Sequence, residues 1–246
     1  METVFCFHGA LNDFLPASRR GQPVRLLCAP DQSFKHLIES LDVPHVEVAA
    51  VRVNGREVRL DALAGAGPVE VYPYATALGA PRPDGEPRFL LDNHLGRLAV
   101  YLRMLGLDTL YRNDYQDDEL AAVAAVGERV LLTRDHRLLM RKAVQYGYWL
   151  RSQDPPEQLR EVVVRYRLRS FFQPFTRCLR CNGPLRLVEA ADVWERLQPL
   201  TQQYYDAFAL CPACDQVYWR GSHYQHMQRL IHSLPDQPEL DGGSGG

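Results

Sequence analysis

Two pairs of cysteines constrain the fold of this chain more than any other feature of its sequence. Each pair has the spacing Cys-x-x-Cys, and the four residues are Cys178, Cys181, Cys211 and Cys214. Two thiolates from one turn reach a single ion, so two such turns complete a closed tetrahedral site of the kind that holds structural zinc. A redox role for a Cys-x-x-Cys turn would not require a second pair. We therefore predict a zinc ribbon over residues 171–232.

The connection between the two pairs, residues 182–210, is longer than the roughly 15–20 residues usual in such ribbons. We expect it to contain an inserted element, with a strand over residues 185–188 and a short helical turn over residues 192–197. His223 follows the second pair and either contacts a ligand or caps the next helix.

The use of cysteine also bears on the compartment. Cys6 and Cys28 lie in strand-like apolar runs and are predicted core thiols. Paired cysteines in a reducing compartment indicate metal binding in preference to disulfides. The N-terminus has no pattern of a targeting peptide, and no run approaches the ~20 apolar residues of a membrane span. We therefore expect a cytoplasmic protein with no membrane partner.

Length and charge limit the architecture and the partners. A chain of 246 residues with 46% hydrophobic residues predicts two or three globular modules. The formal net charge of −2 does not by itself indicate a polyanionic partner. Residues 161–186, however, contain one acidic residue against Arg165, Arg167, Arg169, Arg177, Arg180 and Arg186. This stretch is compatible with phosphate contacts and equally with a solvated arginine-rich face.

Residues 1–73 have the pattern of a small α+β module. We expect two strands over residues 3–7 and 24–27, a helix that Ser33 caps and that runs to residue 41, and further strands over residues 46–53 and 69–72. Asn54 and Gly55 form a tight turn after the third strand. This order predicts a ubiquitin-like β-grasp domain. Residues 74–88 are rich in proline, glycine and alanine, which is typical of a linker.

From residue 89 the chain alternates between strands and helices. We expect strands over residues 89–91, 108–111, 130–133 and 148–150. We expect one helix between the first two strands, ended by Gly106, a second that begins at residue 117, a third from residue 136 to about 145, and a fourth over residues 155–166. Alternation of this kind predicts an α/β domain with a parallel sheet, over residues 89–170, whose ligand site lies at the carboxyl ends of the strands. Residues 233–246 are expected to form a flexible tail.

Acidic residues occupy the predicted strand ends. Asp92 and Asp135 each follow a strand, and Asp117 and Asp118 open a helix. Carboxylates that cluster at one sheet edge repel one another unless a divalent cation lies among them, and Mg²⁺ or Mn²⁺ prefers oxygen ligands. Such an ion polarises a phosphodiester and activates water to attack it. Each carboxylate has an alternative role, because Asp92, Asp117 and Asp135 are also good helix caps.

Several segments resemble one known family. The PIN-like ribonuclease family named for the C-terminal domain of Mut-seven has a series of motifs that this chain resembles in the same order. The similar segments are residues 89–109, 117–120, 129–135, 177–182, 211–214, 218–219 and 221–223. Residues 11–15, 43–48, 53–55 and 71–73 resemble the ubiquitin-like domain often fused ahead of it. The resemblance covers nearly the whole chain.

That resemblance implies a PIN-like fold that binds Mg²⁺ or Mn²⁺ and cleaves RNA. Asp92 and Asp135 would be catalytic metal ligands. The third ligand would be Asp117 or Asp118; we name Asp118 as the ligand, with Asp117 as the open alternative. Asp154 is a candidate fourth acid, and Thr133 would orient Asp135 or a water. The candidate substrate contacts are Arg97, Arg103, Arg134 and His223.

Two classes of function remain. The leading hypothesis is a metal-dependent ribonuclease with a structural zinc ribbon. The alternative is a non-catalytic RNA- or ribosome-binding adaptor, in which the carboxylates are structural and the ubiquitin-like domain and the ribbon dock a protein or ribosome partner.

Overall fold

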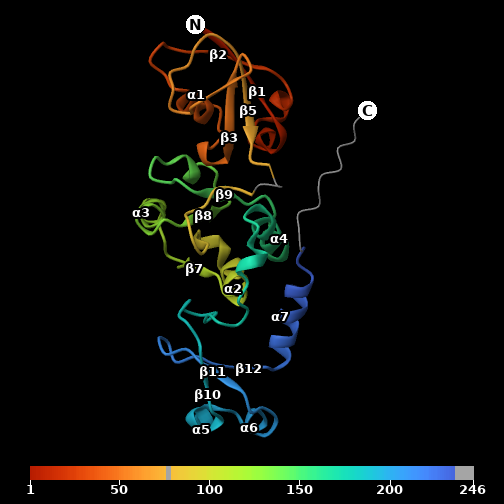
Figure 1. The fold of residues 1–246 in the computed structure, drawn as a ribbon. Coiled ribbons are helices and arrows are strands. Elements are labelled where there is room, and N and C mark those ends of the chain that lie inside the picture. Colours follow the sequence, from red (N-terminus) through yellow and green to blue (C-terminus); the bar gives the residue numbers. More distant parts are fainter. Residues whose placement is uncertain (76–78, 236–246) are drawn as a thin grey trace. The chain divides into compact units, whose positions relative to one another are not determined.

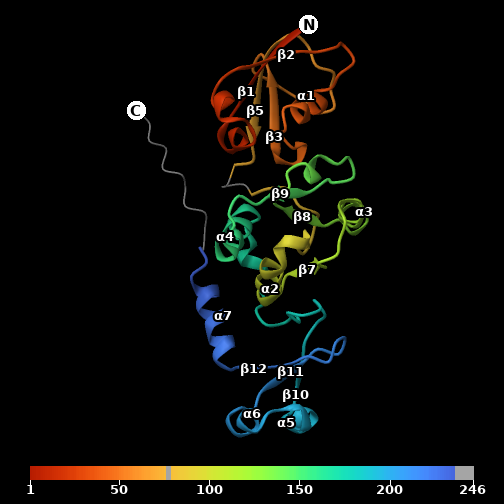
Figure 2. The same ribbon diagram turned by 180° about the vertical axis from the view of Figure 1, so that it is seen from behind.

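The computed structural model describes residues 1–75 and 79–235 (Figures 1 and 2). The chain forms two compact units, and neither is continuous in sequence. The first unit contains Met1–Arg82 and Gln116–Leu150, and the second contains Pro83–Tyr115 and Arg151–Gly246. Most of the predicted tail, residues 236–246, lies outside the described residues.

The first unit contains a five-stranded sheet of mixed direction. Its strands are β1 (Glu2–Phe7), β2 (Val24–Leu27), β3 (Val48–Val53), β4 (Arg56–Val58) and β5 (Gly67–Pro73), in the order β2-β1-β5-β3-β4. The central pair, β1 and β5, is parallel, with Phe5 opposite Val69, and the other pairs are antiparallel. This order matches the predicted β-grasp. The third strand begins at Val48 because residues His45–Glu47 form a 3₁₀ turn before it.

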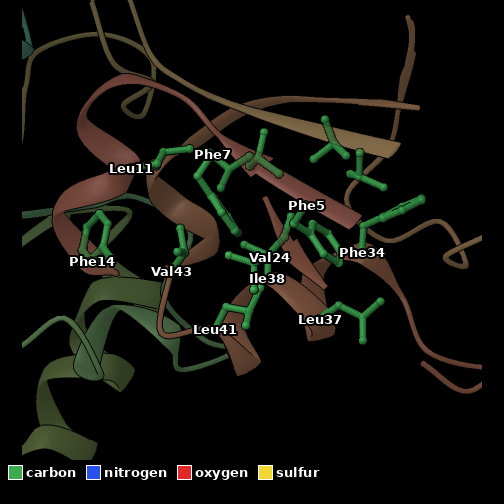
Figure 3. Close-up of a cluster of buried hydrophobic side chains, with 14 of the residues drawn as sticks. Phe5, Phe7, Leu11, Phe14, Val24, Phe34, Leu37, Ile38, Leu41 and Val43 are labelled. Atoms are coloured by element: carbon green, nitrogen blue, oxygen red, sulfur yellow. The ribbon is translucent and has the colours of Figure 1, made fainter. Parts of the chain in front are cut away.

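One helix, α1 (Phe34–Ser40), covers this sheet. Ser33 caps it as predicted, because the Ser33 hydroxyl accepts a hydrogen bond from the His36 amide at 3.2 Å. Phe34, Leu37 and Ile38 are buried against Phe5 on β1 (Figure 3). The spacing of these helical residues places them on one face, so the core follows directly from the sequence pattern.

The first unit also contains α3 (Asp117–Gly127), β8 (Val130–Thr133) and β9 (Gly147–Trp149). The strands β8 and β9 are parallel, with Leu132 opposite Tyr148. All four residues of β8 are buried, which is typical of a strand covered on both faces.

The helix predicted over residues 136–145 is wrong. The structure has only a 3₁₀ turn, Leu138–Met140, in this segment. Leu138, Leu139 and Val144 are all buried, and in an α-helix these positions would point to different sides. The segment instead folds so that Leu139 packs on Gly147, where an added Cβ would lie 2.6 Å from the leucine side chain.

This segment and β9 pack against the β-grasp part of the same unit. The Glu47 carboxylate, 1% exposed, accepts a hydrogen bond from the Trp149 amide at 2.9 Å. The two ring nitrogens of His45 lie 2.7 Å from the Glu39 carboxylate and 3.0 Å from the Val144 carbonyl. The indole of Trp149 packs against the β-grasp core, including Phe14. These contacts explain why residues 116–150 belong to the same compact unit as residues 1–82. The predicted domain boundaries at residues 73, 88 and 170 remain predictions.

The second unit contains a parallel strand pair and the ribbon. The strands β6 (Arg88–Leu91) and β7 (Asp108–Tyr111) pair with Phe89 opposite Thr109. The helix between them, α2 (Gly96–Met104), ends before Gly106, which has a φ of 86° and where a side chain would collide with the Gln173 carbonyl. The helix α4 (Pro155–Arg165) follows as predicted.

The ribbon contains a three-stranded antiparallel sheet in chain order. Its strands are β10 (Arg186–Val188), β11 (Phe208–Leu210) and β12 (Val217–Trp219). The connection between β10 and β11 contains α5 (Ala190–Val193) and α6 (Pro199–Tyr204), which are the inserted element expected from the cysteine spacing. The last helix is α7 (Ser222–His232).

Within the described ranges, none of the helices has the length and apolar character that a membrane span requires.

We predict that Glu47 stabilises the first unit through the Trp149 amide. Glu47→Ala removes a buried acceptor and leaves the amide unsatisfied, so the free energy of unfolding should fall by about 1–3 kcal/mol. Urea denaturation measures the change. Glu57→Ala, on an exposed position of β4, is the control and should change stability by less than about 0.5 kcal/mol. Equal stabilities of the two variants would contradict this role of Glu47.

Candidate functional site

The four cysteines come together in the ribbon. Their sulfur atoms all lie within 4.8 Å of one another, with 3.5 Å between Cys178 and Cys214 and 3.4 Å between Cys181 and Cys211. A tetrahedron with Zn–S bonds of ~2.3 Å places its sulfur atoms about 3.8 Å apart. The cluster is therefore compatible with a zinc site, as predicted.

Both cysteine turns have the same backbone form. The residue after the second cysteine of each pair, Asn182 or Asp215, has a positive φ of 70° or 64°. Its amide donates to the carbonyl of the first cysteine, at 3.0 Å from Asn182 to Cys178 and 2.8 Å from Asp215 to Cys211. Asn and Asp adopt this left-handed conformation more readily than most residues. The residue types next to the cysteines thus favour two matching metal-binding turns.

The surroundings of the thiols differ from one cysteine to the next. Burial raises the pKa of Cys178, but hydrogen bonds from the Tyr218 hydroxyl and from backbone amides outweigh it and lower this pKa to about 6. Burial raises the pKa of Cys211 and Cys214. Zinc binding requires all four thiolates, so the ion would displace protons from the buried thiols.

The first cysteine turn is fixed to the start of β7 by Asn182. This side chain, 8% exposed, accepts from the Thr109 amide at 2.9 Å and donates to the Asp108 carboxylate at 2.8 Å. Arg177 adds hydrogen bonds to the carbonyls of Gly106 and Asn182. The ribbon and the β6–β7 pair are therefore one packed structure within the second unit.

Arg103 reinforces this attachment and is buried, so the prediction that Arg103 contacts substrate is wrong. Its side chain is 4% exposed, and its guanidinium donates to the carbonyls of Thr109, Leu179 and Arg180, each at 3.0 Å. Burial lowers the pKa of Arg103, and the thiolates of Cys178 and Cys181 oppose that shift. Arg103 lies among backbone acceptors because the cysteine turn covers this side of α2.

Asp92 lies directly after β6 in the second unit. It is 7% exposed, and its carboxylate accepts from the Asn93 amide at 2.6 Å, so it caps the short 3₁₀ turn that leads into α2. The Tyr111 hydroxyl donates to the Asn93 carbonyl at 2.9 Å. A Cβ at Gly96 would lie 2.7 Å from that hydroxyl, so only glycine permits this close approach.

Asp135 lies after β8 in the first unit. Its amide donates to the Thr133 hydroxyl at 2.9 Å, so Thr133 orients the backbone at Asp135. The Asp135 carboxylate accepts from the Arg137 amide, two residues on, at 2.9 Å. Arg134 is exposed, and its carbonyl accepts from the Trp149 indole at 3.1 Å. Trp149 thus connects the β-grasp core to the loop that contains Asp135.

Asp117 and Asp118 lie in the first turn of α3, and both pair with Arg141. One guanidinium nitrogen contacts the Asp118 carboxylate, and another lies 3.7 Å from that of Asp117. The helix is capped by Gln116 with Glu119, so the expectation that Asp117 is the cap is wrong. Gln116 takes this position because its side chain and that of Glu119 bond each other's amides.

The remaining candidates lie at the surface. Arg97 on α2 and His223 in the first turn of α7 are exposed. Gly221 is the residue before α7, so His223 does not cap this helix. Asp154 caps α4 by accepting from the Glu157 amide at 3.4 Å.

The four acids do not all belong to one unit. Asp92 is in the second unit, and Asp117, Asp118 and Asp135 are in the first. Within residues 1–75 and 79–235, the four cysteines are the one group of three or more potential ligands close enough to share an ion. A carboxylate metal site is therefore a prediction from the strand ends.

Two family models match the chain. The model described as "Mut7-C RNAse domain" matches residues 87–231, which is more than half of the chain, and the model described as "Mut7-C ubiquitin" matches residues 1–79. The chain belongs to the Mut7-C RNAse domain family. Neither the curated proteins nor the solved structures include a match to it.

The family matches confirm the resemblance and the order of the domains. The Mut7-C RNAse match includes both the α/β part and the four cysteines, so the ribbon belongs to the family domain. The sequence did not predict the roles of two residues. Asn182 anchors the first cysteine turn, and its position in that turn is the only sequence signal for this role. Arg141 pairs with Asp118, and no local pattern predicts this contact.

We predict that the Mut7-C ribbon of this chain binds one zinc ion through its four cysteines. Cys211→Ser should lose the ion, because three remaining thiolates leave the tetrahedral site incomplete. Metal analysis of the purified protein gives the zinc content. Cys6→Ser, on β1, is the matched control and should keep it. Full zinc content in Cys211→Ser would rule out this site.

We further predict that Arg103 stabilises the second unit. Arg103→Met leaves the buried Thr109 carbonyl and the part-buried carbonyls of Leu179 and Arg180 without their donor, so the free energy of unfolding should fall by about 2–3 kcal/mol. Arg97→Met, on the same helix at an exposed position, should change it by less than about 0.5 kcal/mol. Denaturant unfolding distinguishes the two, and similar values for both variants would refute a structural role.

Proposed function

We propose that this protein is a metal-dependent ribonuclease, in which Mg²⁺ or Mn²⁺ held by carboxylates hydrolyses RNA phosphodiester bonds. One observation supports the proposal: the Mut7-C RNAse match includes both Asp92, which directly follows β6, and Asp135, which lies two residues after β8. Ligands bind at the carboxyl ends of parallel strands, and a PIN-like arrangement would bring these two carboxylates to one edge.

The carboxylates would supply the chemistry through the ion. A hard divalent cation binds carboxylate oxygens, polarises the phosphoryl group and activates a water molecule. The protein's part is to hold the acids in place: Thr133 fixes the backbone of Asp135, and Asp92 is restrained by the Asn93 amide. No covalent nucleophile is needed.

The third proposed metal ligand already forms an ion pair with an arginine. We propose Asp118, with Asp117 as the alternative, and the guanidinium of Arg141 contacts the Asp118 carboxylate. A cation that binds Asp118 must take the place of this ion pair. Both acids are largely exposed, so the pair contributes little stability and exchange is inexpensive. Arg141 would then be released to contact a phosphate.

RNA would approach across arginines at the surface. Arg97 and Arg134 are exposed and follow the two strands that lead to Asp92 and Asp135. Guanidinium groups bind phosphate oxygens and position a nucleic acid without reading its sequence. His223 is exposed on the ribbon and is a further candidate contact.

The adaptor hypothesis has its own supporting observation. Asp92 and Asp135 each accept a backbone hydrogen bond in a turn, which is a sufficient structural reason for a carboxylate at both positions. In that case the ubiquitin-like domain would dock a protein or ribosome partner, and the chain would bind RNA without cutting it.

Substitution of the two strand-end acids tests the ribonuclease proposal. The zinc-loaded protein with added Mg²⁺ or Mn²⁺ should cleave an end-labelled single-stranded RNA, and Asp92→Asn or Asp135→Asn should lower the rate at least about a hundredfold, because each loses a metal ligand. Gel analysis of the products gives the rates.

Asp61→Asn, an exposed acid of the β-grasp part that pairs with Arg59, is the control and should keep the wild-type rate. Comparison of Asp117→Asn with Asp118→Asn identifies the third ligand. RNA binding without cleavage in the wild type would favour the adaptor. Cleavage that survives both strand-end substitutions would refute the assignment of Asp92 and Asp135 as the catalytic metal ligands.

A further inference from the structure

The two faces of the ribbon sheet have different environments. On one face Phe208, Leu210 and Val217 are buried in a small core with Val193 and Leu197. On the opposite face a row of paired residues crosses all three strands: Leu187 opposite Ala209, and Ala209 opposite Tyr218. In both ribbon views α5 and α6 lie on one side of the sheet and α7 leaves on the other (Figures 1 and 2).

A groove of about 340 Å³ runs along this second face. Leu187, Ala209 and Tyr218 line it from the sheet, and Phe175 and Tyr224 line it from the preceding loop and α7. The rings of Phe175 and Tyr224 are in contact, with centroids 4.2 Å apart. Ala209 lies between larger neighbours in the cross-strand row, so its small side chain leaves room for a flat group.

The groove is apolar in its lining but remains accessible. Leu187 is 88% exposed, and Trp219 on β12 is 40% exposed. An exposed large apolar side chain is common singly, but a groove with aromatic rings on several sides is typical of a binding site.

Tyr218 is held rigidly within this lining. Its hydroxyl accepts from the Leu179 amide at 3.0 Å and lies 3.2 Å from the Cys178 sulfur. The ring is thus anchored to the first cysteine turn before any ligand arrives. A preorganised aromatic surface loses little conformational freedom on binding.

The charged residues of the lining are arginines. Arg177, Arg186 and Arg220 all line the groove, and Arg186 and Arg220 are exposed. The guanidinium carbon of Arg220 lies 5.8 Å from the centroid of the Tyr224 ring. Cations beside aromatic rings are the combination that binds single-stranded nucleic acids, in which bases stack on the rings and arginines contact the phosphates.

We propose that this groove binds one unpaired base of single-stranded RNA, with Arg186 and Arg220 on the flanking phosphates. The proposal rests on the proposed function, because it names the substrate class of the same protein. The groove volume of about 340 Å³ is at the lower end of pockets that hold small ligands, which suits a single base. A paired base stays in its stack and cannot enter, so the groove selects single strands.

Binding without cleavage tests the groove separately from the catalytic acids. The full-length zinc-loaded protein, without added Mg²⁺ or Mn²⁺, is titrated into a fluorescein-labelled single-stranded oligouridylate, and anisotropy gives Kd. Leu187→Glu should raise Kd at least about tenfold, because it places a charge against the base and phosphates. A fully paired RNA of equal length should bind more weakly to the wild type and respond little to the substitution.

Leu200→Glu is the matched control, since it makes the same change at a 68% exposed leucine of α6 outside the groove. It should bind as the wild type does. Arg220→Gln should reduce the salt dependence of log Kd by about 0.7, the value for one phosphate contact on a single strand. Zinc content and thermal unfolding check that each variant is folded.

The outcomes separate the two proposals. Equal Kd values for Leu187→Glu and Leu200→Glu, or no binding of single strands by the wild type, would overturn the groove whatever the cleavage assay gives. Equal sensitivity of paired RNA to Leu187→Glu would overturn the choice of an unpaired base. Groove-dependent binding without metal-dependent cleavage would support the groove and refute the ribonuclease proposal.

Discussion

The attachment of the cysteine turn to the start of β7 is the interaction on which the second unit depends. Arg103 from α2 donates three hydrogen bonds to backbone carbonyls, and Asn182 bonds both the amide and the carboxylate at the start of β7. A buried guanidinium is tolerated because its Nε and Nη1 atoms donate to three carbonyls and the cysteine thiolates lie nearby. The four-cysteine cluster therefore does more than close the ribbon: it places one rigid turn that packs against the strand and helix beside Asp92.

The first unit depends on a different contact. Glu47 and His45 fold the 3₁₀ turn of the β-grasp part against β9 and the segment before it, and Trp149 joins the same core. The same indole donates to the Arg134 carbonyl, directly before Asp135. The ubiquitin-like domain thus packs against Trp149, which holds the backbone next to Asp135, a proposed catalytic acid. Its presence in the chain has a structural explanation in addition to any partner that it binds.

The ribbon would combine two tasks. One face of its small sheet buries the core that the ribbon needs to fold, and the other face lines an aromatic groove with exposed arginines. Tyr218 links the tasks, because its hydroxyl is anchored at Cys178 while its ring lines the groove. In the proposed function, the ribbon would hold a single strand while the carboxylates and their cation perform the hydrolysis.

The sequence by itself determined the features that depend on local spacing: the cysteine turns, the β-grasp strands with their capped helix, and the strands that precede Asp92 and Asp135. Tertiary packing decided the rest. Arg103 is a predicted substrate contact, but the cysteine turn covers it and leaves it 4% exposed. Residues 136–145 form no α-helix, because packing on Gly147 and the β-grasp part outweighs their helical propensity. The groove joins residues 175, 187, 209, 218 and 224. Residues so far apart in the chain become neighbours only when the sheet and α7 are in place, so no local pattern contains the groove.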